Sequence, residues 1–130
     1  MYQEIIKVRG YELDSLGHVN QANYLLYAES VRWNHFASLG ITLQKMASLG
    51  VGPALLSQKI SYLKELRMGD EVRITSELLE FEGKYGSVQN DFYRGETKVA
   101  ELTITFTFIN LKERRSCPPP PEMLALLKTS

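Results

Sequence analysis

The sequence predicts an α+β fold in which an antiparallel five-stranded sheet wraps around one long helix. One segment has apolar residues at helical spacing, several others alternate apolar and polar residues, and short turns with glycine separate the last three of these. The length of 130 residues fits one domain. We therefore expect a single domain over residues 1–130, in which about 110–130 form a C-terminal tail, and no second domain that carries a cofactor.

The long helix is expected over residues 21–39. Within it, apolar side chains recur every three or four residues, as from Tyr24 to Val31. Asn20 precedes the segment and has a side chain suited to capping the first turn. Gly40 follows it and belongs to the residue type that most often ends helices.

The other regular segments are expected as strands. The last of them alternates an apolar face, from Ala100 to Phe108, with a face of threonine and glutamate, so its apolar face must pack against the helix. Short spacers join the last three strands, which favours antiparallel hairpins. The run Pro118–Pro121 cannot continue a sheet, and one turn of helix is expected over residues 123–127. The strands are expected over residues 4–9, 54–63, 71–81, 87–93 and 98–109.

Composition and charge exclude several classes of function. The 15 basic residues balance the 15 acidic ones, so the chain lacks the excess of positive charge with which proteins bind nucleic acid. Cys117 is the single cysteine, which excludes an internal disulfide and favours a reducing, cytoplasmic location. The N-terminus lacks the apolar run of a signal peptide, and no stretch approaches the ~20 apolar residues that cross a bilayer. Neither nucleic acid nor a membrane is expected as a partner.

Polar residues gather just before the long helix. Asp14, His18 and Asn20 lie within seven residues of one another at its entrance. The first N–H groups of a helix have no partner within it, and the helix dipole adds about half a positive charge there, so an oxyanion would be stabilised. A carboxylate next to such a position can act as a general base on water or attack a carbonyl group. This combination suits acyl transfer.

The same stretch, continued to Arg32, resembles the hotdog-fold acyl-CoA thioesterases of the 4-hydroxybenzoyl-CoA thioesterase type. As in that family, an aspartate, Asp14, is followed three residues later by a glycine, Gly17, and the helix opens with a Tyr-Leu-x-Tyr-x-Glu-x-x-Arg run over residues 24–32. The His-Val-Asn of residues 18–20 is similar to the pattern of plant acyl-ACP thioesterases. The resemblance extends over roughly residues 2–110 and implies a hotdog fold.

The resemblance implies hydrolysis of an acyl thioester, carried by coenzyme A or by an acyl carrier protein. Asp14 would be the general base or nucleophile, and the backbone N–H near Gln21 would bind the oxyanion. A hotdog enoyl-CoA hydratase is an alternative, but Leu16 stands where that family has an asparagine, and His18 comes too early. A non-catalytic module that binds acyl thioesters is a further alternative, because the fold alone does not imply catalysis.

Each residue before the helix also has a structural interpretation. Asp14 could accept hydrogen bonds from the backbone of the following turn. His18 could cap or pack in the loop. Asn20 is most simply the N-cap, which would stabilise the helix by about 1 kcal/mol.

Further candidate residues lie on the helix and the strands. Glu29 is the only acidic residue on the helix that could replace Asp14, although an ion pair with Arg32, in solvent or at an interface, is its default interpretation. Tyr24 is expected to pack on the sheet or to bind substrate, and His35 to be structural. The phosphates of coenzyme A could bind to basic side chains that are otherwise expected in solvent, Lys59 first among them: Lys59, Lys64, Arg67, Lys84 and Arg94.

No cofactor and no metal are expected, since the two histidines and the one cysteine form no recognisable set of ligands. A single sheet with one helix leaves an open edge and a partly covered face. We therefore expect a homodimer or homotetramer with its active sites at a subunit interface.

Overall fold

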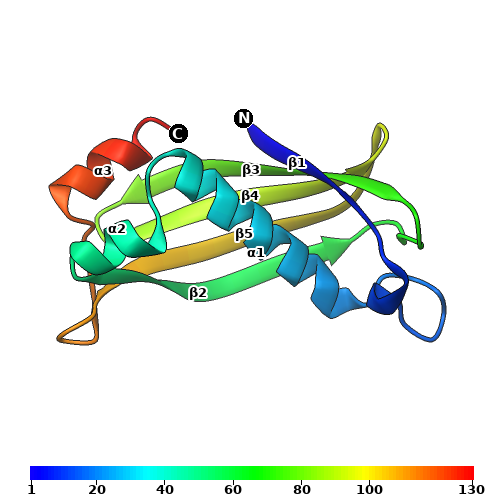
Figure 1. Ribbon diagram of the computed structural model, residues 1–130, viewed down its shortest axis with the longest axis horizontal. Coiled ribbons are helices and arrows are strands. Elements are labelled where there is room, and N and C mark those ends of the chain that lie inside the picture. Colours follow the sequence, from blue (N-terminus) through cyan, green and yellow to red (C-terminus); the bar gives the residue numbers. More distant parts are fainter.

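The computed structural model describes all 130 residues and contains one antiparallel sheet crossed by one long helix (Figure 1). The helix, α1, lies across one face of the sheet, and two short helices lie near the end of the sheet toward which it runs. In chain order the elements are β1 (Tyr2–Lys7), the 3-10 turn η1 (Gly10–Glu12), α1 (Gln21–Ser38), α2 (Leu43–Ser48), β2 (Val51–Tyr62), β3 (Glu71–Glu82), β4 (Tyr85–Arg94), β5 (Thr97–Asn110), β6 (Arg115–Cys117) and α3 (Pro121–Leu127).

The strands lie in the order β1-β3-β4-β5-β2, and every pairing is antiparallel. The expected hairpins β3-β4 and β4-β5 are confirmed, and both turn through a glycine with positive φ, Gly83 and Gly95. β2 does not lie beside β3, its neighbour in sequence, but pairs with β5 at the opposite edge. β2 therefore has a free edge along its whole length.

The two ends of α1 match the sequence prediction. The Asn20 side chain accepts a hydrogen bond from the N–H of Ala22 at 2.9 Å, which confirms it as the N-cap. The helix ends at Ser38 rather than residue 39, and Gly40 follows with φ of 91°, a conformation that glycine adopts without strain. The helix α2 was not expected; its N-cap is Thr42.

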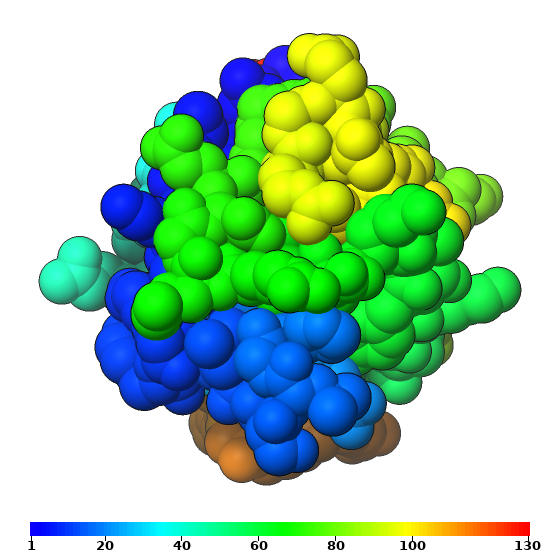
Figure 2. Space-filling view, turned by 90° about the vertical axis from the view of Figure 1, so that its right-hand side faces the viewer, coloured from blue at the N-terminus to red at the C-terminus, as the bar shows by residue number.

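Figure 2 views the molecule from the end at which α1 begins. The loop before α1, in blue, lies against the green segment that connects β2 to β3. The N–H of Val19 in the loop donates to the C=O of Leu66 in that segment at 2.8 Å, and His18 forms a bridge with Arg67. Two segments that are about fifty residues apart in sequence thus form one end of the protein.

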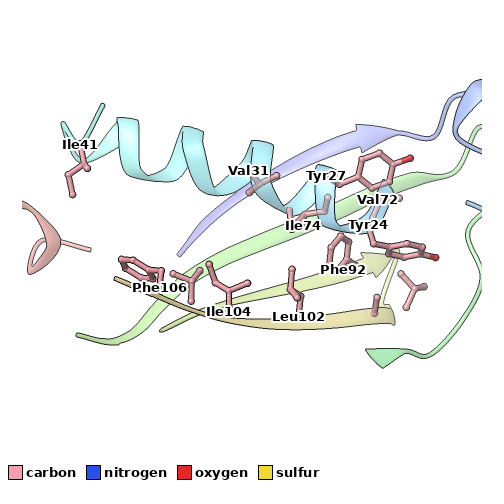
Figure 3. Close-up of a cluster of buried hydrophobic side chains, with 14 of the residues drawn as sticks. Tyr24, Tyr27, Val31, Ile41, Val72, Ile74, Phe92, Leu102, Ile104 and Phe106 are labelled. Carbon is pink, nitrogen blue, oxygen red and sulfur yellow. The ribbon is translucent and has the colours of Figure 1, made fainter. Parts of the chain in front are cut away.

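A single hydrophobic core lies between α1 and the sheet (Figure 3). The residues of β5 that were expected to face the helix, from Ala100 to Phe108 at every second position, are all buried. Tyr24 and Tyr27 on α1 are also buried, as expected of residues that pack on the sheet. Figure 3 shows both rings above β3 and β4, near Phe92.

The structure differs from the sequence prediction at both termini. The first strand covers residues 2–7 rather than 4–9, because Val8 and Arg9 turn into η1. The expected tail is packed onto the domain: β6 adds a sixth, short strand beside β5, and α3 buries Met123 and Leu127. The prolines between them do not join the sheet, so only the residues before them extend it. No α-helix is both long and apolar enough to cross a membrane.

Candidate active site

The loop between η1 and α1 forms a tight turn around the Asp14 carboxylate. One oxygen, Oδ1, accepts hydrogen bonds from the N–H groups of Leu16 at 2.8 Å and His18 at 3.1 Å. Gly17 permits the turn with φ of 78°. The structural interpretation of Asp14 is thus correct as far as Oδ1 is concerned. The second oxygen, Oδ2, has no hydrogen-bond partner in the chain, and the side chain is exposed, so Asp14 can hold the turn and still accept a proton.

The start of α1 leaves the N–H of its first residue free. The Asn20 side chain accepts from Ala22, and the Asn20 C=O accepts from the N–H of Asn23 at 2.9 Å. The N–H of Gln21, the first residue of the helix, has no partner within the chain. Because the helix dipole also concentrates positive charge here, this N–H can stabilise a developing oxyanion.

A buried residue, Glu12, holds the loop in place through its carboxylate and its backbone. Its Oε1 accepts from the N–H of Arg9 at 2.8 Å and from the hydroxyl of Tyr27 at 2.7 Å, and its Oε2 accepts from the Arg9 guanidinium at 2.7 Å. Its backbone C=O accepts from the N–H of Asn20 and from the side-chain amide of Asn23. Glu12 therefore joins the segment that follows β1, the loop and α1.

The environment of Glu12 keeps it ionised. Burial by itself would raise the pKa of its carboxyl, but the hydrogen bonds from Arg9 and Tyr27 outweigh burial and lower the pKa below its ordinary value. Burial and the hydrogen bond to Glu12 raise the pKa of the Tyr27 hydroxyl, so it remains a donor. Glu12 was not among the predicted site residues, since no local pattern in the sequence distinguishes its side chain from an exposed one.

The turn, the start of α1 and the end of β2 border an open cleft of about 490 Å³. Of the residues expected in the site, Asp14, His18, Asn20, Gln21 and Tyr24 all line it. Lys59 does not; it is exposed farther back on β2, and the basic residue at the cleft is Lys64. The full lining is Asp14, His18, Val19, Asn20, Gln21, Tyr24, Tyr62, Leu63, Lys64 and Glu65.

Aromatic rings form the floor of this cleft. The ring of Tyr24 is buried and meets the ring of Tyr62 edge-on, with centroids 5.1 Å apart. On its other side it contacts Phe92 in the core at 5.6 Å. Tyr24 thus packs on the sheet and lines the cleft at the same time, so the two interpretations of this residue are compatible.

A second cavity of about 210 Å³ lies along the C-terminal half of α1. It is formed by α1, α2 and the beginning of β2, over the far part of β5, and it is largely apolar. Its lining is Glu29, Arg32, Trp33, Phe36, Ile41, Met46, Pro53, Ala54, Leu55, Ile104, Phe106 and Phe108.

The expected ion pair between Glu29 and Arg32 is wrong. Glu29 is exposed, whereas the Arg32 side chain is directed inward and donates from Nη1 to Oδ1 of Asn90 on β4 at 3.0 Å. The spacing along the helix permitted the pair, but Arg32 lies on the side of α1 that faces the sheet. Glu29 is therefore remote from the turn of Asp14 within the chain, at the border of the second cavity.

His35 has the structural role expected of it. Its ring is buried between the rings of Tyr2 and Phe36, and its Nδ1 lies 2.8 Å from the hydroxyl of Ser76. Burial lowers the pKa of His35, which favours the neutral ring. Nowhere in the chain do three side chains of the histidine, cysteine, aspartate and glutamate types come together as a set of metal ligands.

Comparison with known proteins identifies the family. A family model described as the thioesterase-like superfamily matches residues 8–127. The chain belongs to the thioesterase-like superfamily. A curated relative of this superfamily, the long-chain acyl-CoA thioesterase FadM of Escherichia coli (strain K12), is 33% identical over 117 residues, which cover 88% of this chain and 87% of FadM.

Two further relatives are consistent with this assignment. The crystal structure of the probable thioesterase YbaW of Escherichia coli superposes with a TM-score of 0.89 at 31% identity, over 98% of this chain and 97% of the other. A chloroplastic acyl-acyl carrier protein thioesterase of Arabidopsis thaliana is 38% identical over 66 residues, 51% of this chain and 35% of its own length. The expected hotdog thioesterase fold is confirmed, and this member of the superfamily is an enzyme that hydrolyses acyl thioesters.

Proposed function

We propose that the cleft at the start of α1 is the active site and that Asp14 is its general base or nucleophile. One observation carries this proposal. The Oδ2 atom of Asp14 and the N–H of Gln21 have no hydrogen-bond partner within the chain, and both residues line the same cleft. A base and an oxyanion donor are the two groups that thioester hydrolysis requires.

The reaction follows from these two groups. As a general base, Asp14 accepts a proton from water while the water oxygen bonds to the thioester carbon, and the carbonyl oxygen, now negative, accepts the hydrogen bond of Gln21. Collapse of this intermediate breaks the C–S bond, and the thiolate leaves and takes up the proton. As a nucleophile, Asp14 would attack the carbon itself and expel the thiolate, which leaves an anhydride that water then hydrolyses. His18 and Asn20 position the turn and the helix start.

Coenzyme A is the carrier that we propose. FadM is named for acyl-CoA, and it is the relative that matches over most of both chains. Lys64 at the rim of the cleft supplies a cation for the phosphates of coenzyme A. An acyl carrier protein is the alternative carrier, because the chloroplastic relative, which matches over half of this chain, is named for it. The single, unpaired Cys117 fits a reducing compartment, and we propose the cytoplasm.

A panel of thioesters tests this function. The purified protein is incubated with acyl-CoA and acyl-ACP substrates of varied chain length, and release of free thiol is measured. We expect turnover of acyl-CoA substrates that the Asp14→Asn variant loses. Binding without hydrolysis would indicate the non-catalytic module, and hydration of an enoyl-CoA without thiol release would indicate the hydratase.

We also propose that the protein is a homodimer, or a homotetramer of such dimers, joined through the free edge of β2. This edge strand of 12 residues carries exposed apolar side chains, including Leu55, Leu56 and Tyr62. Two copies related by a twofold axis would pair their β2 strands antiparallel. The end of one β2, beside the cleft, would then lie near the beginning of the other, beside the second cavity, and the active sites would be at the interface.

Light scattering tests the assembly. The wild-type protein is expected to have the mass of a dimer or tetramer at micromolar concentration, and Leu56→Lys to shift the mass toward the monomer and reduce turnover. A fully active wild-type monomer would contradict an active site shared between subunits.

A further inference from the structure

The second cavity contains one charged group that its apolar lining does not explain. Aromatic and aliphatic side chains such as Trp33, Phe36, Ile104 and Phe106 form most of its wall. Figure 3 shows Ile104 and Phe106 on the sheet, beneath the C-terminal half of α1, with Ile41 beyond the end of the helix. A cavity of this kind suits the hydrocarbon part of an acyl group. Arg32 nevertheless lines it, and its side chain is only 6% exposed.

The guanidinium of Arg32 is only partly used by the protein. Its one hydrogen bond is the one from Nη1 to Oδ1 of Asn90, and it forms no ion pair. Asn90 is itself fully buried and fixed by donating to the C=O of Thr75 at 3.0 Å. Every fully buried side-chain nitrogen in the protein has a hydrogen-bond partner. The Nε and Nη2 atoms of Arg32 have none, so they are not fully buried. The accessible space that Arg32 borders is the cavity.

Such an arrangement is costly if the cavity receives only hydrocarbon. A guanidinium has five donors, and an acyl chain without oxygen would cover the free ones and remove their water. An acyl group with an oxygen atom at this point would instead accept a hydrogen bond from a charged donor, which is among the stronger kinds. The hydrogen bond to Asn90 fixes the guanidinium in one position, and fixed side chains of this kind are typical of residues that determine substrate specificity.

The charge around the cavity favours a neutral oxygen over a carboxylate. Glu29 precedes Arg32 by about one helical turn and lies at the border of the cavity. Its negative charge offsets that of Arg32 and would repel a second carboxylate. A hydroxyl or a keto oxygen accepts the hydrogen bond without this repulsion.

We propose that the second cavity binds the acyl group of the substrate and that Arg32 selects acyl groups bearing a hydroxyl or keto oxygen. This inference rests on the proposed thioesterase function and adds the class of substrate. Arg32 lies roughly 16 Å along the helix axis from Gln21 of its own chain, given a rise of about 1.5 Å per residue. The position along the acyl chain at which an oxygen would meet Arg32 thus depends on whether the thioester binds in the cleft of the same subunit or in that of the partner subunit.

The test uses matched pairs of acyl-CoA substrates. The two members of each pair have the same chain length; one is unsubstituted, and the other carries a hydroxyl or keto group. Across the series of pairs, the position of this group varies from next to the thioester to the far end of the acyl chain. At one or more positions we expect kcat/KM of the wild-type enzyme to favour the oxygenated member by about tenfold or more. A pair with a terminal carboxylate is expected to show no such preference.

Variants identify the group responsible. Arg32→Met keeps an unbranched, flexible side chain but removes the guanidinium and its donors. The preference at the selected position is therefore expected to fall to within about twofold, while unsubstituted chains are still hydrolysed. Arg32→Lys keeps a charged donor, should Arg32→Met fail to fold, and is expected to retain part of the preference. The matched control is Arg115→Met. Arg115 is an exposed arginine on β6 that lines neither the cleft nor the second cavity, so this change should leave the preference intact.

The outcomes separate this inference from the function on which it rests. If the wild-type enzyme hydrolyses no thioester at all, the proposed function fails. If it hydrolyses the panel but favours the unsubstituted member at every position, the function stands and the inference is overturned. A lower melting temperature of Arg32→Met with an unchanged substrate preference would also overturn it, because Arg32 would then serve only to attach α1 to β4.

Discussion

The two ends of the central helix differ in what they leave unsatisfied. At its beginning the cleft is open and polar, and two groups remain without partners, the Oδ2 of Asp14 and the N–H of Gln21. Along its C-terminal half the cavity is apolar, and the free groups are the remaining donors of Arg32. Chemistry with water needs access to solvent, whereas binding a hydrocarbon chain needs its exclusion. One helix supports both because its two ends meet different parts of the sheet.

The same contrast appears between two carboxylates only two residues apart. Glu12 is buried, and both of its oxygens accept hydrogen bonds from Arg9 or Tyr27. Asp14 is exposed and uses one oxygen to hold its turn. We therefore expect Glu12 to contribute mainly to stability and Asp14 mainly to turnover.

The largest effect is expected from Asp14→Asn. The amide oxygen can still accept the hydrogen bonds of Leu16 and His18, so the turn and the fold should persist. Loss of the base or nucleophile should lower kcat by about 10²–10⁴-fold. Measuring kcat and the melting temperature on one preparation separates catalysis from stability.

Asp70→Asn is the matched control for this variant. Asp70 also holds a loop, since its carboxylate accepts from the N–H of Arg67 at 2.9 Å, but it does not line the cleft. We expect a small loss of stability and unchanged turnover. An Asp14→Asn protein with kcat within about threefold of wild type would remove Asp14 from the mechanism and leave Glu29 or His18 as candidates.

The next largest effect is expected from Glu12→Gln. The variant loses charge-assisted hydrogen bonds from Arg9 and places an amide donor near that guanidinium, which should reduce the free energy of unfolding by about 1–3 kcal/mol near neutral pH. Denaturant unfolding measures this change. If kcat per folded molecule fell by about a hundredfold with stability unchanged, the roles assigned to the two carboxylates would be reversed.

The pH dependence of the Glu12→Gln effect has a definite sign. The pKa of Glu12 in the folded protein lies below its ordinary value of 4.5, so its contribution is fully present well above that pH. The contribution is lost as the pH falls below 4.5 toward the folded-state pKa. The difference in stability between wild type and variant should therefore shrink in acid. Glu122→Gln, at an exposed ion pair with Lys45, should change stability by less than about 1 kcal/mol at either pH.

A smaller effect is expected from His18→Ala. The backbone N–H of His18 holds the turn, and its side chain forms no hydrogen bond within the chain. Truncation should thus keep the turn and lower kcat by less than about tenfold, below the range typical of a lost general base. A loss as large as that of Asp14→Asn would show that the His18 ring takes part in the chemistry.

The smallest effect is expected from a chelator. Water is the second substrate, and the protein supplies the base and the oxyanion donor, so turnover after treatment with EDTA and gel filtration should equal that of untreated enzyme. Loss of activity that a divalent metal restores would contradict the proposed mechanism.

Much of the candidate site could be predicted because its determinants are local. The turn of Asp14 and the cap of Asn20 depend on residues within four positions, and the order of residue types over 14–32 carries the resemblance to the family. The burial of Glu12 and the hydrogen bond between Arg32 and Asn90 could not be predicted. Their partners come from elements 15 and 58 residues away, and the local patterns were equally compatible with exposed side chains.

The sequence by itself determined the period of the long helix and of the five main strands, the ends of α1 to within one residue, the apolar face of β5 and the chemistry of the loop. Only the tertiary structure decided that β1 pairs with β3 and β2 with β5, that residues 110–130 pack onto the sheet, and that Lys64 rather than Lys59 reaches the cleft. The physical reason is that the alternation of apolar residues states which face of an element is buried but not which element covers it. That choice depends on packing the whole core at once, and the cleft and the cavity are products of that packing.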